Sequence, residues 1–159
     1  MRWKPDVTVA AVIERDGRFL LVEEHINGHL VFNQPAGHLE DDESLVDAAI
    51  RETLEETAWR FEPQALVGVY LWKSPESLRT FVRVALCGQA SKHDASRVLD
   101  HGIARVVWLS REQIAARAPR LRSPMVLRCI DDYLSGARYP LEALQYLSMD
   151  VQTAIAVGN

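Results

Sequence analysis

The residues of this chain whose types and spacing most directly suggest chemistry are three glutamates within five positions, Glu52, Glu55 and Glu56. Residues three and four apart share a helix face, so each like-charged pair would cost roughly a few tenths of a kcal/mol in a helix. Grouped carboxylate oxygens suit Mg²⁺ or Mn²⁺, and Mg²⁺ commonly binds one or two carboxylates together with substrate phosphates. We therefore predict that a divalent cation, and with it a substrate phosphate, offsets the repulsion.

The helix that positions these glutamates is predicted to begin at Leu45 and to end near Thr57. Ser44 is a favourable N-cap residue, and Asp47 three residues later gives a variant of the capping box. At about 100° per residue, the glutamates fall at the margin of the buried face, where an unpaired carboxylate is expensive. The core-facing sector is expected to come from Val46, Ile50 and Thr53.

Two of the glutamates conflict with a second local rule. Glu55 and Glu56 fall in the last turn of the predicted helix, where the macrodipole is negative and disfavours a carboxylate by roughly 0.3 to 1 kcal/mol. Violations of local rules concentrate at functional sites. The alternative, for the glutamates taken alone, is a solvated acidic helix end that Arg51 and Arg60 partly neutralise.

The remaining pattern predicts a mixed α/β domain in which helices pack on a sheet. Asp16 and Gly17 mark a hairpin turn, and the segment NQPAGHLEDDE has the composition of a loop. A second polar loop is expected over residues 89–102. Further helices are predicted over 110–118 and 125–134, and strands over 7–15, 18–24, 29–32, 65–72, 78–87 and 104–110.

Composition and charge restrict the class of protein. The 159 residues suffice for one domain, expected over 1–147, with 148–159 as a flexible C-terminal tail. A net charge of -4 argues against binding to polymeric DNA or RNA, so a small anionic substrate would need a metal or local arginines. Cys87 and Cys129 are predicted to be free thiols, and no apolar run has the length of a signal peptide or membrane span. We expect a cytoplasmic protein, monomeric or homodimeric, that binds no membrane.

The stretch GHLEDDESLVDAAIRETLEETAW resembles the Nudix box, the signature of a family of hydrolases. The box reads Gly, five residues, Glu, seven residues, and then Arg-Glu-aliphatic-any-Glu-Glu-any-Gly-aliphatic. Thr53, Ala58 and Trp59 depart from it, and Ala58 must either adopt a left-handed conformation or end the helix differently. The matching residues are Gly37, Glu43, Arg51, Glu52, Glu55 and Glu56.

The resemblance extends to the NudJ branch of bacterial Nudix phosphatases, through KPDVTVA, NQPAGHLE, LRSP and RYPLE. It implies the Nudix α/β/α sandwich with a mixed β-sheet, dependence on Mg²⁺ or Mn²⁺, and hydrolysis of phosphoanhydrides in small molecules. The branch is associated with release of inorganic phosphate from nucleoside tri- and diphosphates and from pyrophosphate esters of the thiamin pathway. The alternatives are an enzyme that cleaves internally, giving a monophosphate plus pyrophosphate or splitting nucleotide sugars, and a non-catalytic module that binds nucleotides.

The resemblance also assigns roles to the residues of the box. Glu52, Glu55 and Glu56 would hold the metal, with the carbonyl oxygen of Ala36 as a further ligand. Mg²⁺ held there would screen the phosphate oxygens and lower the pKa of the attacking water.

Arg51 is expected to act with Glu52 and Glu55 in catalysis and to form a structural ion pair with Glu43. A carboxylate that is not fully committed to the metal would serve as the general base. Glu52 and Glu55 are the candidates within the box, and two residues of the polar loop are alternatives, Asp94 and Asp100.

Substrate contacts are expected from outside the helix. Alternation along a strand places Arg79, Phe81 and Arg83 on one face, where arginines around a ring could bind phosphate and stack on a base. The alternative is two solvated arginines over a packed ring. His38 and Asp100 are further candidates for substrate contact. Tyr70 and Trp72 of the preceding strand form a similar pair that could belong to such a platform, and packing in the core is the favoured interpretation.

Overall fold

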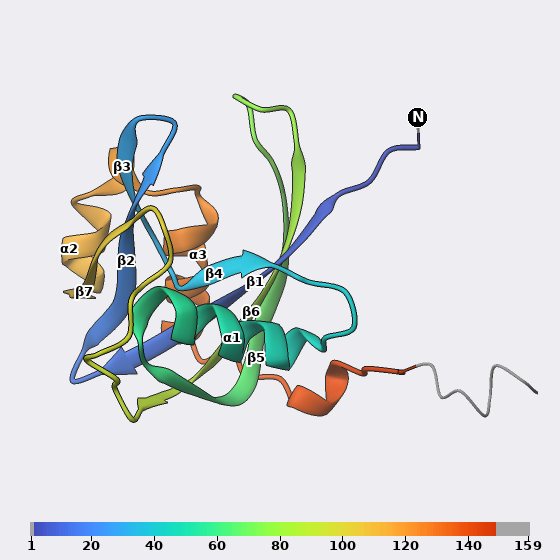
Figure 1. Ribbon diagram of the computed structural model, residues 1–159. Coiled ribbons are helices and arrows are strands. Elements are labelled where there is room, and N and C mark those ends of the chain that lie inside the picture. The colour runs from blue at the N-terminus through green and yellow to red at the C-terminus, as the bar shows by residue number, and fades with distance from the viewer. Residues whose placement is uncertain (1, 149–159) are drawn as a thin grey trace, which may run out of the picture.

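The computed structural model describes residues 2–148, which form a mixed β-sheet with helices on both faces (Figure 1). Residues 149–159, almost all of the expected tail, lie outside the described residues. The strands are β1 (Asp6–Arg15), β2 (Arg18–Ile26), β3 (His29–Asn33), β4 (Ala36–His38), β5 (Arg60–Lys73), β6 (Thr80–Ser91) and β7 (Ile103–Ser110).

The β1 strand organises the sheet. β6 pairs with it in parallel and places Arg83 opposite Thr8, while β4 pairs with it antiparallel and places His38 opposite Thr8. The hairpin turn to β2 has positive φ at both Asp16 and Gly17, as a turn matched to the twist of its strands requires. The strand order is β3-β2-β1-β6-β5, with β4 paired to β1 and β7 paired to β2.

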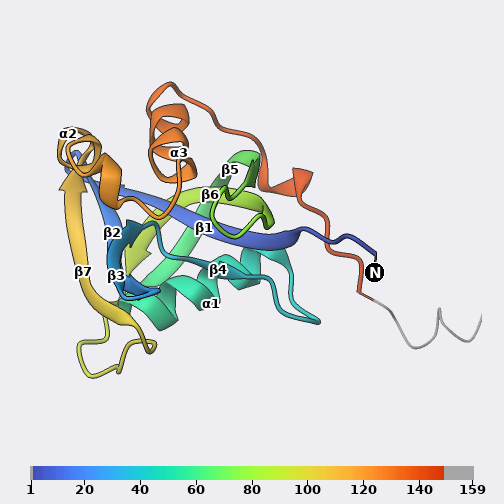
Figure 2. The ribbon, with the colours of Figure 1, turned by 90° about the horizontal axis from the view of Figure 1, so that it is seen from above.

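The helices form two layers, one on each face of the sheet (Figure 2). α1 (Leu45–Thr57) packs over one face, and its Ala49 joins a buried apolar cluster with Phe61 of β5. α2 (Arg111–Ala115) and α3 (Met125–Leu134) cover the opposite face. The predicted α/β/α sandwich with a mixed sheet is therefore confirmed.

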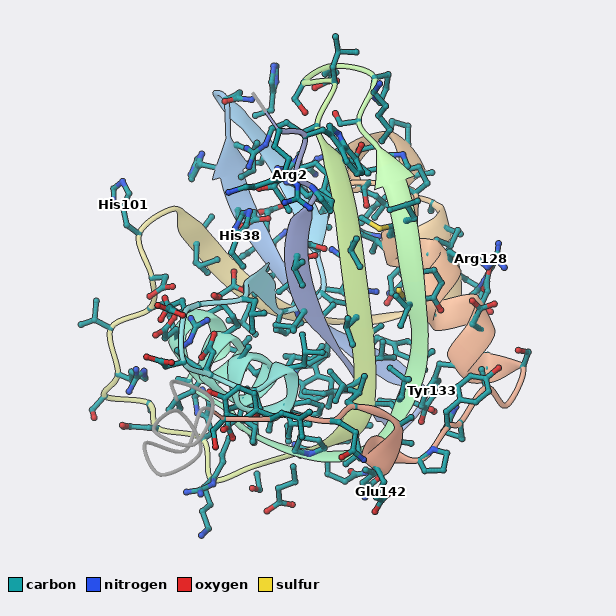
Figure 3. All side chains as sticks on the ribbon, turned by 90° about the vertical axis from the view of Figure 1, so that its right-hand side faces the viewer. Arg2, His38, His101, Arg128, Tyr133 and Glu142 are labelled. Atoms are coloured by element: carbon teal, nitrogen blue, oxygen red, sulfur yellow. The ribbon has the colours of Figure 1, made fainter. Side chains whose placement is uncertain are left out.

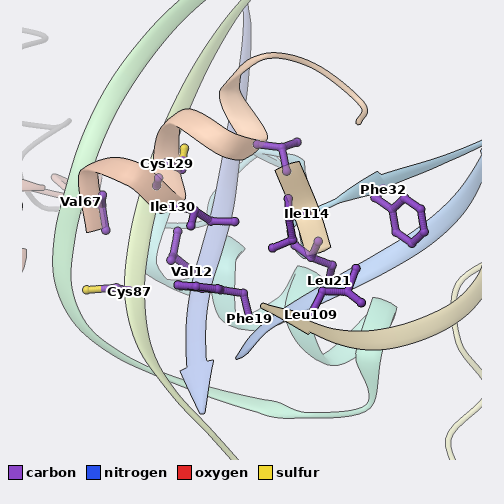
Figure 4. Close-up of a cluster of buried hydrophobic side chains, with 12 residues drawn as sticks. Val12, Phe19, Leu21, Phe32, Val67, Cys87, Leu109, Ile114, Cys129 and Ile130 are labelled. Carbon is purple, nitrogen blue, oxygen red and sulfur yellow. The ribbon is translucent and has the colours of Figure 1, made fainter. Parts of the chain in front are cut away.

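A second apolar cluster lies between α3 and the sheet (Figure 4). Val12 of β1, Phe19 of β2 and Ile130 of α3 are almost completely buried there, and burial of each such side chain stabilises the fold by roughly 1.5 to 3 kcal/mol. Two short 3-10 helices, η1 (Ala118–Arg120) and η2 (Leu141–Ala143), complete the described chain. Among the described helices, none has the length and apolar character needed to span a membrane.

The bounds of α1 agree with those expected from its capping residues. The Ser44 hydroxyl accepts the N–H of Asp47 at 3.0 Å, as an N-cap does. At the other end, Ala58 adopts φ 61° and ψ 11° and donates its N–H to the Leu54 carbonyl at 2.9 Å. Of the two ways to end the helix without glycine, the chain uses the left-handed one.

The buried face of α1 agrees with the expected sector at Thr53, which is fully buried, but not at the two aliphatic residues. Val46 and Ile50 are only half-buried, because the face toward the sheet is centred on other residues. The hydroxyls of the two buried threonines are satisfied by carbonyls one turn earlier, at 2.6–2.7 Å. The buried residues of the helix are Ala48, Ala49, Thr53, Glu56 and Thr57.

Two other expectations on secondary structure were wrong. The segment predicted as a loop contains β4, since Gly37 and its neighbours pair with β1. The helix predicted over 110–118 ends at Ala115, and the chain continues through η1, which contains Pro119. Proline lacks the N–H that a continuing α-helix would need.

Candidate active site

Three carboxylates converge at the C-terminal end of α1. One oxygen each of Glu52, Glu55 and Asp100 lies within 4.8 Å of the others. Asp100 comes from the loop before β7, where its backbone N–H donates to the Glu55 carbonyl at 3.0 Å. This bond fixes a distant loop to the glutamate helix, so the acidic residue that the loop contributes lies among the box residues.

Glu56 lies beside this group in a different environment. Its side chain is buried and accepts the N–H of Ala36 at 2.7 Å. Burial raises its pKa to about 9, and the negative charges of Glu24, Glu52 and Asp100 act in the same direction. For Ala36 the recorded contact with the glutamates is through its N–H, so metal ligation by its carbonyl stays a prediction.

The group fits a divalent cation in two respects. All its donors are carboxylate oxygens, which is the ligand chemistry of Mg²⁺ and Mn²⁺. Within residues 2–148, no arginine or lysine forms an ion pair with Glu56, so its charged form lacks a cationic partner. A cation beside it would favour that charged form.

Arg51 connects the group to the preceding loop. Its Nε and Nη2 donate to both Glu43 oxygens, at 2.9 and 2.7 Å, and its Nη1 donates to Glu52 at 2.8 Å and Glu55 at 3.2 Å. The ion pair holds the pKa of Glu43 below its usual value. For Glu52, burial raises the pKa and Arg51 opposes that effect. One guanidinium therefore orients two of the three converging carboxylates.

The close approach of β4 to these carboxylates requires a glycine. A Cβ atom added to Gly37 would overlap the carboxylate of Glu52. The next residue of β4, His38, lies beside β1 with its Nε2 3.7 Å from Asp6 (Figure 3). The glycine of the box thus leaves space for the Glu52 carboxylate.

A cavity of about 250 Å³ is lined in part by Ala36 and Gly37 of β4, which lie against Glu56 and Glu52, although the carboxylates of α1 are not themselves among its lining residues. β4 forms the wall between the cavity and the side chains of Glu52 and Glu56, and β6 contributes Phe81 and Arg83 to the lining. The wider lining comprises Thr8, Glu24, Ile26, Asn33, Ala36, Gly37, His38, Trp72, Phe81, Arg83, Arg122, Ser123 and Met125.

The three residues expected to share a strand face lie close together, with the Arg79 guanidinium 5.4 Å from the centroid of the Phe81 ring, but they differ in their contact with the cavity. Phe81 and Arg83 line the cavity, whereas Arg79 precedes β6 and forms a bidentate ion pair with Asp6 at 2.6 and 2.9 Å. Arg79 is exposed and is not among the residues that line the cavity. Burial lowers the pKa of Arg83, which is 3% exposed.

The interpretation of Trp72 as a core residue was wrong. Its ring stacks on Phe81 with centroids 6.0 Å apart and lines the cavity. Tyr70 packs against the cluster under α3 and donates its hydroxyl to Asp132 at 2.7 Å, as the core interpretation expects. Because Trp72 lies opposite Phe81 in the β5–β6 register, only that register reveals the stacked pair.

Two further cavity residues, Glu24 and Arg122, were not among the residues expected to contact the substrate. Glu24 lies in β2, two residues before the end of the strand, and Arg122 belongs to the loop before α3. Arg122 falls within the LRSP segment of the family resemblance, but only the tertiary structure brings it to the same cavity as Glu24.

Comparisons with known proteins agree with this geometry. Residues 3–129 match the NUDIX domain. The chain is 44% identical over 142 residues to the proteins named Phosphatase NudJ of Escherichia coli (strain K12) and Shigella sonnei (strain Ss046), covering 89% of this chain and 92% of each relative.

Solved structures agree as well. A NUDIX hydrolase from Nitrosomonas europaea aligns with a TM-score of 0.89 and 48% identity, over 91% of this chain and 98% of that chain. A MutT NUDIX hydrolase from Burkholderia pseudomallei aligns with a TM-score of 0.69 over 82% of this chain and 98% of that chain, and at 20% identity it shares the fold alone.

Proposed function

Because the chain belongs to the Nudix hydrolase family and acts on phosphoanhydrides, we propose that it is a Mg²⁺-dependent phosphatase of small molecules. Its substrates are nucleoside tri- and diphosphates and pyrophosphate esters such as those of the thiamin pathway, and it releases inorganic phosphate. The observation that carries the proposal is the convergence of three carboxylates within 4.8 Å beside a cavity with arginines. The likeness to phosphatases of the NudJ type supports terminal cleavage.

Glu52, Glu55 and Asp100 would hold the metal, and Glu56, which lies beside them, is a further proposed ligand. When bound, Mg²⁺ or Mn²⁺ supplies Lewis acidity and neutralises charge on the phosphate oxygens. The residues of the chain do the positioning: Arg51 holds Glu52 and Glu55 in place through bonds of 2.8 and 3.2 Å.

The proton of the attacking water passes to one of the same carboxylates. Glu52, Glu55 and Asp100 are the candidates for this general base, because each presents an oxygen to the group. A positioned base of this kind contributes roughly 10² to 10⁴ in rate.

A phosphate-release screen over nucleotides and pyrophosphate esters, with and without Mg²⁺, tests the proposal. We expect release only with Mg²⁺ or Mn²⁺, and a loss of roughly 10² or more in kcat for Glu52→Gln. The matched control is Glu62→Gln, because Glu62 is exposed on β5 and, among the described residues, its carboxylate accepts a hydrogen bond from Ser91 alone. Turnover that needs no metal, or equal activity of the two variants, would contradict it.

Hydrolysis in ¹⁸O-labelled water distinguishes terminal from internal cleavage. The label appears in inorganic phosphate if the terminal phosphorus is attacked. Release of pyrophosphate together with a nucleoside monophosphate would instead support the internally cleaving alternative, and metal-dependent binding without turnover would support a nucleotide sensor.

A further inference from the structure

Two arginines of the cavity have hydrogen-bond donors to spare. Arg83 uses Nη1 and Nη2 to bind the side-chain oxygens of Gln34 and Asn33, at 2.7 and 2.9 Å, and its buried Nε has no hydrogen-bond partner among the described residues. Arg122 is exposed at the mouth of the same cavity. Within residues 2–148, no ion pair or side-chain hydrogen bond of Arg122 is formed.

The surroundings of Arg83 leave its charge poorly compensated. Its hydrogen-bond partners are neutral amides, which are themselves fixed, since Gln34 also donates to the Val126 carbonyl at 2.7 Å. The Cys129 thiol lies near enough to favour the charged form, but sulfur is a weak acceptor. Buried donors without partners are rare in native proteins and mark places where a ligand or water belongs.

The wall of the cavity that contains Arg83 also presents a flat aromatic surface. Phe81 lies two residues before Arg83 on β6, so both side chains emerge on one face of the sheet, and Trp72 stacks on Phe81 at an interplanar angle of 25°. Stacking against such rings holds a heterocycle without regard to its identity. Selectivity for one heterocycle over another must therefore come from polar groups that contact the edge of the bound ring.

Glu24 supplies the acceptor that arginines lack. Burial raises the pKa of its carboxyl, and Arg122 and Arg83 lie close enough to lower it. The cavity thus places a carboxylate and two guanidinium groups around one ring-sized space.

We propose that Arg83, Arg122 and Glu24 select the heterocycle of the substrate, favouring rings with a carbonyl beside a ring N–H, such as guanine and uracil, over adenine. This inference rests on the proposed function. Arginine only donates hydrogen bonds, so it fits the carbonyl oxygen of guanine or uracil, and Glu24 accepts the adjacent N–H. Adenine would turn its exocyclic amine toward the arginines and offers no ring N–H to Glu24.

The test compares kcat/KM for GTP, UTP, ATP and inorganic tripolyphosphate with Mg²⁺ present. We expect GTP and UTP to exceed ATP by about 5-fold to 150-fold, the range that a good contact to a base edge provides. Arg83→Met and Arg122→Gln should lower kcat/KM for GTP and UTP toward the value for ATP, and should lower it for tripolyphosphate, which has no ring, by a smaller factor. The control is Arg128→Gln, because this arginine points outward from α3 and pairs with Asp132 (Figure 3).

Equal kcat/KM for the three nucleotides would overturn the inference, as would variants that lose tripolyphosphate and GTP activity to the same extent. Arg122 is exposed, so its variant keeps the test informative even if Arg83→Met fails to fold. If no substrate is hydrolysed, the proposed function fails instead, and selectivity is measured by calorimetric binding of GTP and ATP.

Discussion

At the scale of single residues, Glu56 has an environment unlike that of the other carboxylates. It is 6% exposed, and its pKa rises from an ordinary 4.5 to about 9, chiefly through burial. A folded-state pKa above the unfolded value adds stability that is complete below pH 4.5 and is lost as the pH rises toward 9. Without metal, the free energy of unfolding must therefore decrease as the pH rises through the neutral range.

Glu56→Gln should remove this pH dependence. In the presence of a chelator, we expect the free energy of unfolding of the unmodified protein to fall between pH 5 and pH 8 by on the order of a few kcal/mol. Glutamine cannot ionise, so the variant should show a flat profile. Urea denaturation at several pH values measures this, with Glu62→Gln as control; an equal slope in both variants would contradict the assignment.

At the scale of elements, the ends of α1 decide where the site lies. Ala58 keeps a left-handed conformation that costs a residue with a Cβ about 1 to 2 kcal/mol. Its carbonyl accepts the N–H of Asp94 at 3.0 Å, at the beginning of the loop that delivers Asp100. The strained helix end therefore anchors the segment that completes the carboxylate group.

The N-cap of α1 gives a prediction at the same scale. Ser44→Ala removes the bond to the Asp47 N–H, so we expect the free energy of unfolding to fall by about 1 kcal/mol. Asparagine is an equally good N-cap residue, and Ser44→Asn should restore the stability. Thermal and urea unfolding of the three proteins measure this, and an unstable Ser44→Asn variant would show that the cap is not the cause.

At the scale of the whole molecule, Glu23 joins segments that are far apart in the chain. This buried residue of β2 accepts from Arg105 of β7 at 2.9 Å and from Arg120 of η1 at 2.7 Å. Arg105, and to a smaller extent Arg120, lower its pKa from an ordinary 4.5. A lowered folded-state pKa adds stability above the unfolded value that is lost as the pH falls below it.

Glu23→Gln should therefore reduce stability at neutral pH and flatten the loss of stability in acid. Both arginines are substantially exposed, so solvent screening limits the effect to about 1 kcal/mol. Denaturation between pH 7 and pH 3 compares the variant with the unmodified protein. If stability falls equally between pH 7 and pH 3 in both proteins, the ion pairs of Glu23 contribute nothing to stability.

The sequence by itself determined the features that depend on neighbours a few residues apart. Capping residues and periodicity fixed the bounds of α1 and the approximate strands, and the spacing of Glu52, Glu55 and Glu56 indicated a metal. These signals are readable because a helix or strand repeats every few residues. The left-handed end at Ala58 was one of two outcomes that local rules allowed.

The tertiary structure alone decided which distant residues share the site. Asp100 reaches Glu55 through one backbone bond, and the β5–β6 register turns Trp72 into the cavity, while Arg79 remains outside it with Asp6. No local pattern encodes such a register, because the pairing of strands depends on the packing of both sheet faces. The sequence thus specified the helix that carries the glutamates, and the fold specified the cavity that β4 lines beside it.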